Sequence, residues 1–479
     1  MAFVHVPAFS SRHHRACRYS VNIRSRPLAF SSVQDSTVQA CVATTIEKEV
    51  EPTIPVSPAS PVQLPVEHVE GLQSPGYIDD GYFGIPDSVQ FWRSYVPAES
   101  SNLAEHIRQI TSFVTNDPAN AQYWFHTLTR FTVLSAARNG LRYLQTNEDT
   151  IVGRRHASTG AMITAQLKLL DQALHTLRQD YENVTRGTYK LPWDLTLQHS
   201  SQNVFSVLKL LGTFSRMSQR QADNMLQSEP DISVWLDGAF FPKYYKQTYH
   251  FQADGWMSSD SANIYDAQTE LFFTGLQDAM ERTAFCAMSP YIREAKPTRK
   301  LNIVEVAAGT GRFATFTRDN WPQADYVISD LSPFYLQKAR ENMNYWEKTQ
   351  GKKYSNLGSV RYVHAPGEKL PLKSASADIL YAVYVFHELP PEARRAVINE
   401  AARVLKPGGL FVLTDSVQRG DRVLEDFDLA SFGDFNEPWY RTYIDENFGD
   451  VVCSSGNFEP YLKNQNLLTK TLSFKRTQA

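Results

Sequence analysis

A run of small residues after an apolar stretch is the first feature of this sequence that could bind a ligand. It extends from Glu305 through Gly309 and Gly311 and has the sequence EVAAGTGRFA. Small residues let the backbone approach a ligand closely, and a helix that starts after Gly311 would offer free amide groups. Nineteen residues beyond Gly311, Asp330 ends a second apolar stretch. Its carboxylate could accept hydrogen bonds from both hydroxyl groups of a ribose, so the pattern predicts a nucleoside site.

Two classes of nucleoside ligand fit this turn. The G-x-G-x-x-A pattern that begins at Gly309 satisfies the loose fingerprint of nicotinamide dinucleotide folds, which makes an NAD(P)-dependent oxidoreductase one hypothesis. Glu305 argues against it, because an acid at the end of the strand suits a cationic amino-acid ligand and is unfavourable beside a pyrophosphate. The segment Arg403 to Asp415, RVLKPGGLFVLTD, follows a helix and turns sharply at Pro-Gly-Gly into a strand.

His387 is the candidate catalytic residue, at the end of the fourth apolar stretch. Its ordinary pKa lies near neutrality, so it could act as a general base. It could equally pack under the ligand or orient a substrate. His387 and Glu388 do not form a zinc motif, because the residue four positions beyond His387 is Pro391. The four cysteines are scattered, so we expect no disulfide framework and no metal.

The elements that position these residues begin at Leu301. The expected strands are 301–307, 325–330, 359–365, 377–386 and 409–415, and the expected helices are 312–320, 333–350 and 391–405. Nearly continuous apolar strands that alternate with helices predict a parallel sheet covered on both faces, a doubly wound α/β fold. One or two edge strands between Val451 and Phe474 should complete the sheet. Ligands of such sheets bind beyond the carboxyl ends of the strands.

These motifs resemble those of class I S-adenosylmethionine (SAM)-dependent methyltransferases. The resemblance is carried by VEVAAGTGRFA, Asp330, GEKLPL, FHELP and RVLKPGG, and it covers about residues 240–474. It is strongest to the UbiE-like quinone methyltransferases and related proteins of cyanobacteria and plastids. The resemblance implies a Rossmann-like fold with SAM as co-substrate.

The same resemblance implies roles for individual residues. The glycine turn would hold the methionine part of SAM, and Asp330 would bind the ribose. Backbone amides near Gly367 or the carboxylate of Glu368 would serve the adenine, although Glu368 could also be a solvated loop acid. Two positions depart from the family pattern, Ala307 in place of a glycine and Pro366 where relatives often have Asp or Asn. The expected cofactor-binding residues are Glu305, Ala307, Gly309, Gly311, Asp330, Leu331, Gly367 and Glu368.

Residues 80–239 have helical patterning and no catalytic signature. One apolar stripe with alternating steps of four and three comprises Ile163, Leu167, Leu170, Leu174, Leu177 and Tyr181. A second stripe lies between Val204 and Phe214. The aromatic-rich segment 240–300 is either a lid over the site or core between two units, and it should contain a helix from Ser261 to Met280. Another aromatic segment, 427–443, is a candidate substrate cap.

The amino terminus differs in composition from the rest. Its first 34 residues contain five arginines and six serines and no acidic residue, which is typical of an organelle transit peptide. We expect a transit peptide at 1–45, for a plastid with a mitochondrion as the alternative. Six prolines then predict an extended linker at 46–79. The methyltransferase domain would occupy 301–479.

Net charge and hydropathy limit the classes of binding partner that this protein is expected to have. The net charge is −3 and there is no basic stripe, so a nucleic-acid partner is not expected. No apolar run is long enough to span a bilayer, which leaves peripheral contact with a membrane open. The sequence therefore predicts a SAM-dependent methyltransferase that acts on a small-molecule acceptor, with a quinone or another aromatic metabolite implied by the resemblance alone. Besides the oxidoreductase, a catalytically silent binding protein with this fold is an alternative.

Overall fold

The computed structural model describes residues 79, 81–97, 103–116, 118–151, 159–195, 199, 235–236, 238, 240–252, 254–295, 300–422, 429 and 437–478. The expected transit peptide, nearly all of the expected linker and the apolar stripe at 204–214 lie outside these residues, as does most of the candidate cap at 427–443. Among the residues described, no helix has the length and apolar character needed to cross a lipid bilayer.

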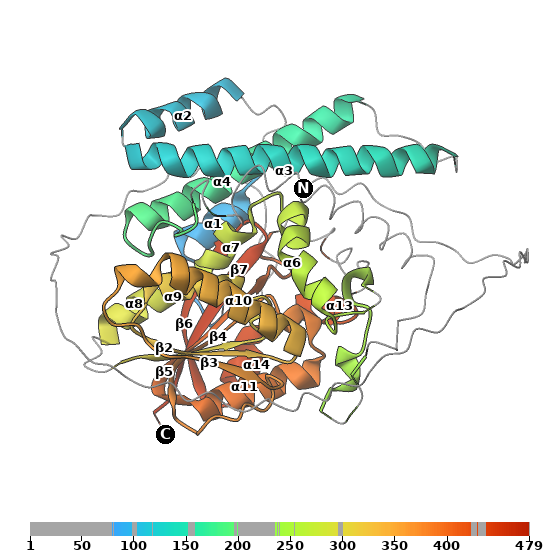
Figure 1. Ribbon diagram of the computed structural model, residues 1–479. Coiled ribbons are helices and arrows are strands. Elements are labelled where there is room, and N and C mark those ends of the chain that lie inside the picture. Colours follow the sequence, from blue (N-terminus) through green and yellow to red (C-terminus); the bar gives the residue numbers. More distant parts are fainter. Residues whose placement is uncertain are drawn as a thin grey trace, which may run out of the picture.

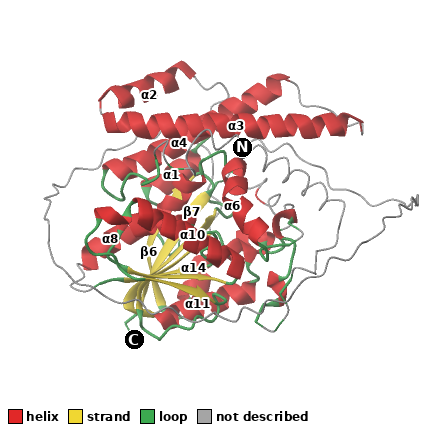
Figure 2. Ribbon diagram, viewed as in Figure 1, coloured by secondary structure: helices red, strands yellow, loops and turns green. Residues whose placement is uncertain are grey.

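A seven-stranded sheet forms the carboxy-terminal part of the structure (Figures 1 and 2). Its strands are β1 Asn302–Val306, β2 Asp325–Asp330, β3 Val360–His364, β4 Ala377–Val383, β5 Leu405–Ser416, β6 Phe458–Asn466 and β7 Thr469–Arg476. Their spatial order is β3-β2-β1-β4-β5-β7-β6. The first five strands run parallel, whereas β7 is antiparallel to both β5 and β6. The predicted doubly wound, mostly parallel α/β fold is thus confirmed.

The chain reverses its direction of winding between β1 and β4, and this reversal fixes where a ligand can bind. From β1 the chain adds β2 and β3 on one side, then crosses back to add β4 and β5 on the other. The loops that leave β1 and β4 therefore diverge, which opens a crevice at the carboxyl ends of these two strands.

Helices cover both faces of the sheet, as Figure 1 shows for α9 and α10 on one side of the strands and α11 on the other. The helices of this part are α9 Arg312–Asn320, α10 Pro333–Thr349, α11 Pro391–Val404, α13 Tyr440–Ile444 and α14 Phe448–Cys453, with short 3₁₀ turns η5 Gly351–Lys353 and η6 Phe386–Glu388. Along β1, Ile303 joins the core cluster that contains α9 residues, whereas Val304 and Val306 join the cluster that contains α11 residues. This alternation follows from the two-residue period of a strand.

The amino-terminal helices share a core with the sheet. They are α1 Asp87–Ser94, α2 Leu103–Asn116, α3 Pro118–Ile151 and α4 Thr159–Thr185. The ring of Phe83 packs edge-on against Phe474 of β7, and Gln179 of α4 donates to the carbonyl of Gln465 in β6 at 2.7 Å. The predicted stripe lies on α4, where Leu174, Leu177 and Tyr181 are buried and Ile163 is exposed. In Figure 1, α2 and α3 lie farthest from the sheet.

Between these helices and β1 lie the connecting elements η2 Lys243–Tyr245, η3 Tyr249–Phe251, α6 Ser259–Phe272, α7 Gln277–Glu281, η4 Arg282–Ala284 and α8 Phe285–Ala295. The single helix predicted from Ser261 to Met280 is wrong. Thr274 and Gly275 adopt positive φ angles of 52° and 80°, which end α6 and reorient the chain before α7. Leu276 and Met280 are fully buried.

The predicted end of the fourth strand is also wrong. Tyr384 has a φ of 50°, so β4 stops at Val383 and the chain turns into η6 instead of continuing to Phe386. The amide of Tyr384 donates to the carbonyl of Thr414 at 2.9 Å, which fixes this turn against β5. As a result, His387 lies on a 3₁₀ turn and not at the tip of a strand.

Candidate active site

The turn from β1 to α9 has the left-handed backbone that its small residues permit. Ala307, Gly309 and Gly311 have φ angles of 54°, 55° and 68°. A Cβ atom on Gly311 would come within 2.8 Å of the Cβ of Ala339 in α10, so this position requires glycine for packing as well as for conformation. Ala307 occupies a conformation that costs a residue with a Cβ on the order of 1 kcal/mol. The first amide groups of α9 have no partner within the helix and remain available.

Asp330 closes this turn from the end of β2. Its Oδ2 accepts the amide hydrogen of Gly309 at 2.7 Å, and its Oδ1 accepts that of Ser332 at 2.7 Å. Burial raises the pKa of Asp330 to about 6, although the backbone amides of Ser332, Gly309 and Leu331 oppose the rise. Because the two oxygens of a carboxylate can together accept about four hydrogen bonds, acceptor capacity remains for a ribose hydroxyl.

Glu305 lies inside β1, beneath the turn. Its Oε2 accepts the hydroxyl of Tyr381 at 2.8 Å, and that hydroxyl lies 3.1 Å from Oγ1 of Thr317 in α9. Burial, with a smaller contribution from the charge of Asp330, raises the pKa of Glu305 to about 8 against the opposing hydrogen bond from Tyr381. A cationic group bound nearby would favour the ionised carboxylate and reverse this shift. The sequence pattern did not indicate Tyr381 as the partner of Glu305.

The expected adenine-side residues follow β2 and β3. Leu331 packs with Phe241, Tyr245 and Met257, and its carbonyl lies 2.9 Å from Nε2 of His364. A Cβ atom on Gly367 would come within 2.7 Å of Val306, so the loop after β3 lies close against the end of β1.

Glu368 accepts a hydrogen bond from the hydroxyl of Tyr244. This bond ties Glu368 to the aromatic segment, and its role toward the adenine stays a prediction.

The aromatic segment from Phe241 to Met257 crosses the carboxyl edge of the sheet. Ser332, after β2, donates to the carbonyl of Trp256 at 2.5 Å. The hydroxyl of Tyr249 lies 3.3 Å from the carbonyl of Glu388, after β4, and its ring stacks on Trp256 at 4.1 Å. Together with the bond between Tyr244 and Glu368, these contacts reach the loops after three strands. Both a lid over the site and core packing between two units fit these contacts, because Phe241, Tyr245 and Met257 also form a buried cluster.

His387 is paired with a carboxylate that the sequence analysis did not single out. Its Nδ1 lies 2.5 Å from Oδ1 of Asp415, near the end of β5. Oδ2 of Asp415 accepts the amide hydrogen of Phe386 at 2.7 Å, which fixes the carboxylate. Burial alone would lower the pKa of His387, but the charge of Asp415 outweighs it and raises the pKa to about 9. The rings of Tyr440 and Tyr443 flank the imidazole at 5.9 and 6.1 Å.

The predicted residues thus fall into two groups at one edge of the sheet. Hydrogen bonds join Gly309 to Asp330, and Leu331 follows Asp330 directly. His387 forms the second group with Asp415, and the two groups are linked through the aromatic segment rather than by a direct bond.

Comparison with known proteins shows which proteins this chain resembles. Residues 303–409 match a family described as "Methyltransferase domain". The UbiE ubiquinone/menaquinone biosynthesis C-methyltransferase of Idiomarina loihiensis is 23% identical over 201 residues, which cover 41% of this chain and 69% of that protein. An Arabidopsis thaliana protein named "Uncharacterized methyltransferase At1g78140, chloroplastic" is 30% identical over 126 residues, 26% of this chain and 33% of that protein.

Solved structures are similar at a lower level. The superposition on the carbon methyltransferase CurJ covers 78% of this chain and 98% of the CurJ chain, with 15% sequence identity and a TM-score of 0.34. The superposition on a SAM-dependent methyltransferase from Aquifex aeolicus covers 46% of this chain and 99% of that chain, with 12% sequence identity and a TM-score of 0.32. The assignment rests instead on the sequence matches and on the strand order, which agree. The chain contains a class I SAM-dependent methyltransferase domain.

Proposed function

We propose that this protein transfers a methyl group from SAM to an oxygen-bearing small molecule. The bond between Asp330 and the amide of Gly309 carries the proposal, because it holds a buried carboxylate with free acceptor positions beside a turn of small residues. When bound, SAM supplies an electrophilic methyl group on a positively charged sulfur.

The residues of the turn fit this co-substrate. Asp330 would accept the ribose hydroxyls, and Glu305 would provide negative charge beneath the methionine part. Ala307, Gly309 and Gly311 would let the backbone approach, and Leu331, Gly367 and Glu368 would border the adenine. The aromatic segment would exclude water and hold the acceptor in line with the methyl group, and such alignment supplies much of the rate of a displacement.

His387 would act on the acceptor through Nε2, because Asp415 occupies Nδ1. Because its pKa is about 9, His387 is protonated at neutral pH and would donate a hydrogen bond to an acceptor oxygen; it would receive that oxygen's proton only after losing its own. We place the acceptor among quinols or other aromatic metabolites, by analogy with what the name of the UbiE relative says of that protein. Import into a plastid is part of the proposal, supported by the basic, serine-rich start of the chain and by the chloroplastic name of the Arabidopsis relative.

The test is transfer of labelled methyl from SAM to extracted plastid metabolites by the purified protein. With the acceptor identified, His387→Asn and Asp415→Asn should each lower kcat by about 10²- to 10⁴-fold, because the group that orients or deprotonates the acceptor is lost. Calorimetry should find SAM affinity within about twofold of the wild type, since neither residue belongs to the turn. His175→Asn, a change on α4, is the matched control and should leave kcat unaltered. Equal loss of SAM binding in all variants, or no labelled product from the wild type, would refute the proposal.

A further inference from the structure

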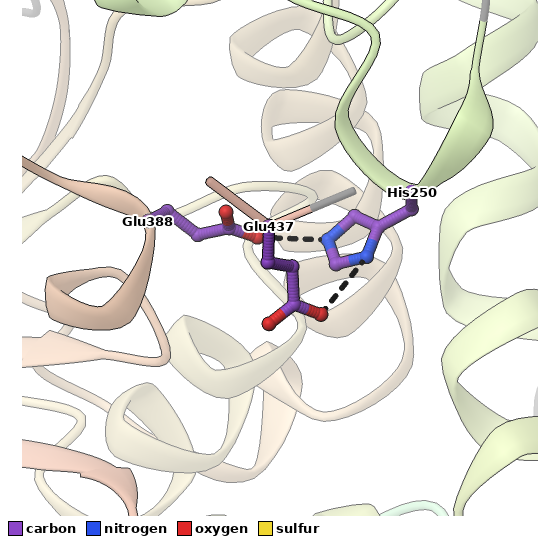
Figure 3. A group of neighbouring side chains, drawn as sticks. All are labelled: His250, Glu388 and Glu437. Atoms are coloured by element: carbon purple, nitrogen blue, oxygen red, sulfur yellow. Dashed lines mark ion pairs between the residues drawn. The ribbon is translucent and has the colours of Figure 1, made fainter. Parts of the chain in front are cut away.

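Three side chains from distant parts of the sequence converge in the structure (Figure 3). His250 comes from η3, Glu388 from η6 after β4, and Glu437 from the segment before α13. Nε2 of His250 lies 2.8 Å from Oε1 of Glu388, and Nδ1 lies 3.3 Å from Oε1 of Glu437. One ligand atom from each residue lies within 4.8 Å of the others.

Glu388 is the unusual member of this group. The residue is 3% exposed, and its Oε1 faces Nε2 of His250, whereas its Oε2 has no hydrogen-bond partner in any part of the chain that the structure describes. Its nearest charged neighbours are the rings of His250, at 2.8 Å, and of His387, at 3.6 Å. A buried carboxylate oxygen without a donor is costly, and in native proteins such an atom often faces a bound ion or water.

The donor set indicates which ion would fit. Burial alone would lower the pKa of His250, but the two glutamates raise it to about 10, so a metal would have to displace a proton from the imidazole. The two glutamates would then leave a charge of about −2, which a divalent cation neutralises. One nitrogen and two carboxylate oxygens suit a transition ion such as Zn²⁺, Mn²⁺ or Co²⁺, whereas Mg²⁺ and Ca²⁺ prefer oxygen ligands alone. Three protein ligands also leave coordination positions open, as in catalytic zinc sites.

We propose that His250, Glu388 and Glu437 bind a divalent transition-metal ion at the acceptor side of the active site. Ligands at about 2.1 Å from a metal lie roughly 3.0–3.5 Å apart. Nε2 of His250 and Oε1 of Glu388 already lie 2.8 Å apart, whereas ligand atoms as far as 4.8 Å from one another must approach by about 1–2 Å when the ion binds. Each ligand is carried on a loop or a short 3₁₀ turn and not in the middle of a strand, so such a movement leaves the sheet intact. This departs from the absence of a metal that the sequence predicted.

The position of the group suggests what the ion does. Because Glu388 follows His387 directly, an open coordination position would face the same acceptor as His387. An oxygen of that acceptor, phenolic or enolic, would bind the ion and lose its proton more readily. This second statement rests on the proposed function, whereas the metal site itself does not.

The metal site is tested on the full chain, stripped with a chelator and titrated with Co²⁺ and Mn²⁺. We expect one equivalent of metal per chain, and pulsed electron paramagnetic resonance of bound Mn²⁺ should detect a single imidazole nitrogen. Glu388→Gln and Glu437→Gln should each weaken binding by at least about 100-fold, and His250→Gln should remove the nitrogen signal. Glu392→Gln, an exposed neighbour on α11, is the matched control and should bind as the wild type does.

Binding of SAM by each variant, measured by calorimetry, reports whether the protein is folded and tests the proposed function separately. The site is refuted if the SAM-binding wild type takes up no metal, which would mean that His250 is a protonated partner of both glutamates. It is also refuted if the three variants retain metal with unchanged affinity. Metal binding without methyl transfer would leave the site standing and overturn only the proposed function.

Discussion

Asp330 combines two tasks in one carboxylate. Its bonds to the amides of Gly309 and Ser332 close the β1–α9 turn, and its remaining acceptor positions would take the ribose. Only the ionised form can accept from all of these donors at once. A nucleoside should therefore bind the ionised form more tightly than the protonated form, and binding should depend on pH.

The uncharged nucleoside 5′-methylthioadenosine isolates this effect, because it carries the ribose without the sulfonium or the amino acid. Since burial raises the pKa of Asp330 to about 6, protonation should weaken binding as the pH falls through 6. We expect an affinity about tenfold lower at pH 5 than at pH 7.5, measured by calorimetry. Asp330→Asn should bind more weakly at every pH, with no step between these values. A step of the same size in that variant would assign the titration to another group.

The sequence could predict Asp330 as a site residue, but it could not predict Asp415, His250 or Glu437. Asp330 was identifiable because it ends an apolar strand at a fixed distance from a small-residue turn. Asp415 also ends a strand, but nothing in its spacing ties it to His387, and only the sheet order brings them together. His250 and Glu437 are harder still, since they lie in segments without a regular pattern.

At the scale of elements, the β1–α9 turn depends on Gly311 more than on Ala307. An alanine at 311 would combine a φ of 68° with a Cβ only 2.8 Å from Ala339, so α9 and α10 would have to separate. We expect Gly311→Ala to lower the free energy of unfolding by about 2–4 kcal/mol. Ala307→Gly should change it by less than about 1 kcal/mol, because relief of the positive φ is offset by the flexibility of glycine. Urea unfolding of both variants measures these free energies. Equal stabilities of Gly311→Ala and Ala307→Gly would contradict the packing argument.

Strands and helices were predictable where a strong period lasts over the whole element. The predicted helix 312–320 coincides with α9, and 333–350 and 391–405 each exceed the observed helix by one residue. The errors occur where single residues take left-handed angles, at Tyr384 and at Thr274 with Gly275. Apolar periodicity does not report such angles, and a tyrosine or threonine gives no signal for them.

At the scale of the whole molecule, four buried charges join the amino-terminal part to the last two strands. Lys470 of β7 lies 2.7 Å from Asp79 and 3.0 Å from Asp421, and Lys463 of β6 lies 3.1 Å from Asp421. All four side chains are fully buried. The charges of Lys470 and Lys463 overcome the effect of burial and hold the pKa of Asp421 at about 2.

Removing one member would leave uncompensated charge in the interior. Lys470→Met should cost about 3–5 kcal/mol of stability, measured by chemical unfolding at neutral pH. Lys475→Met is the matched control from the same strand, where the lysine pairs with Glu294 at the surface; it should cost less than about 1 kcal/mol. Similar losses in the two variants would show that the buried group contributes no more than a surface pair.

The edge-on packing of Phe83 against Phe474 has a practical consequence for anyone who trims this protein. A fragment that starts at 301 would match the methyltransferase family fully, yet it would present to water the apolar rings and the buried lysines that the amino-terminal helices cover. Such a fragment should aggregate on expression, because a large newly exposed apolar patch promotes self-association. A fragment expressed for recombinant work should therefore begin no later than Asp79.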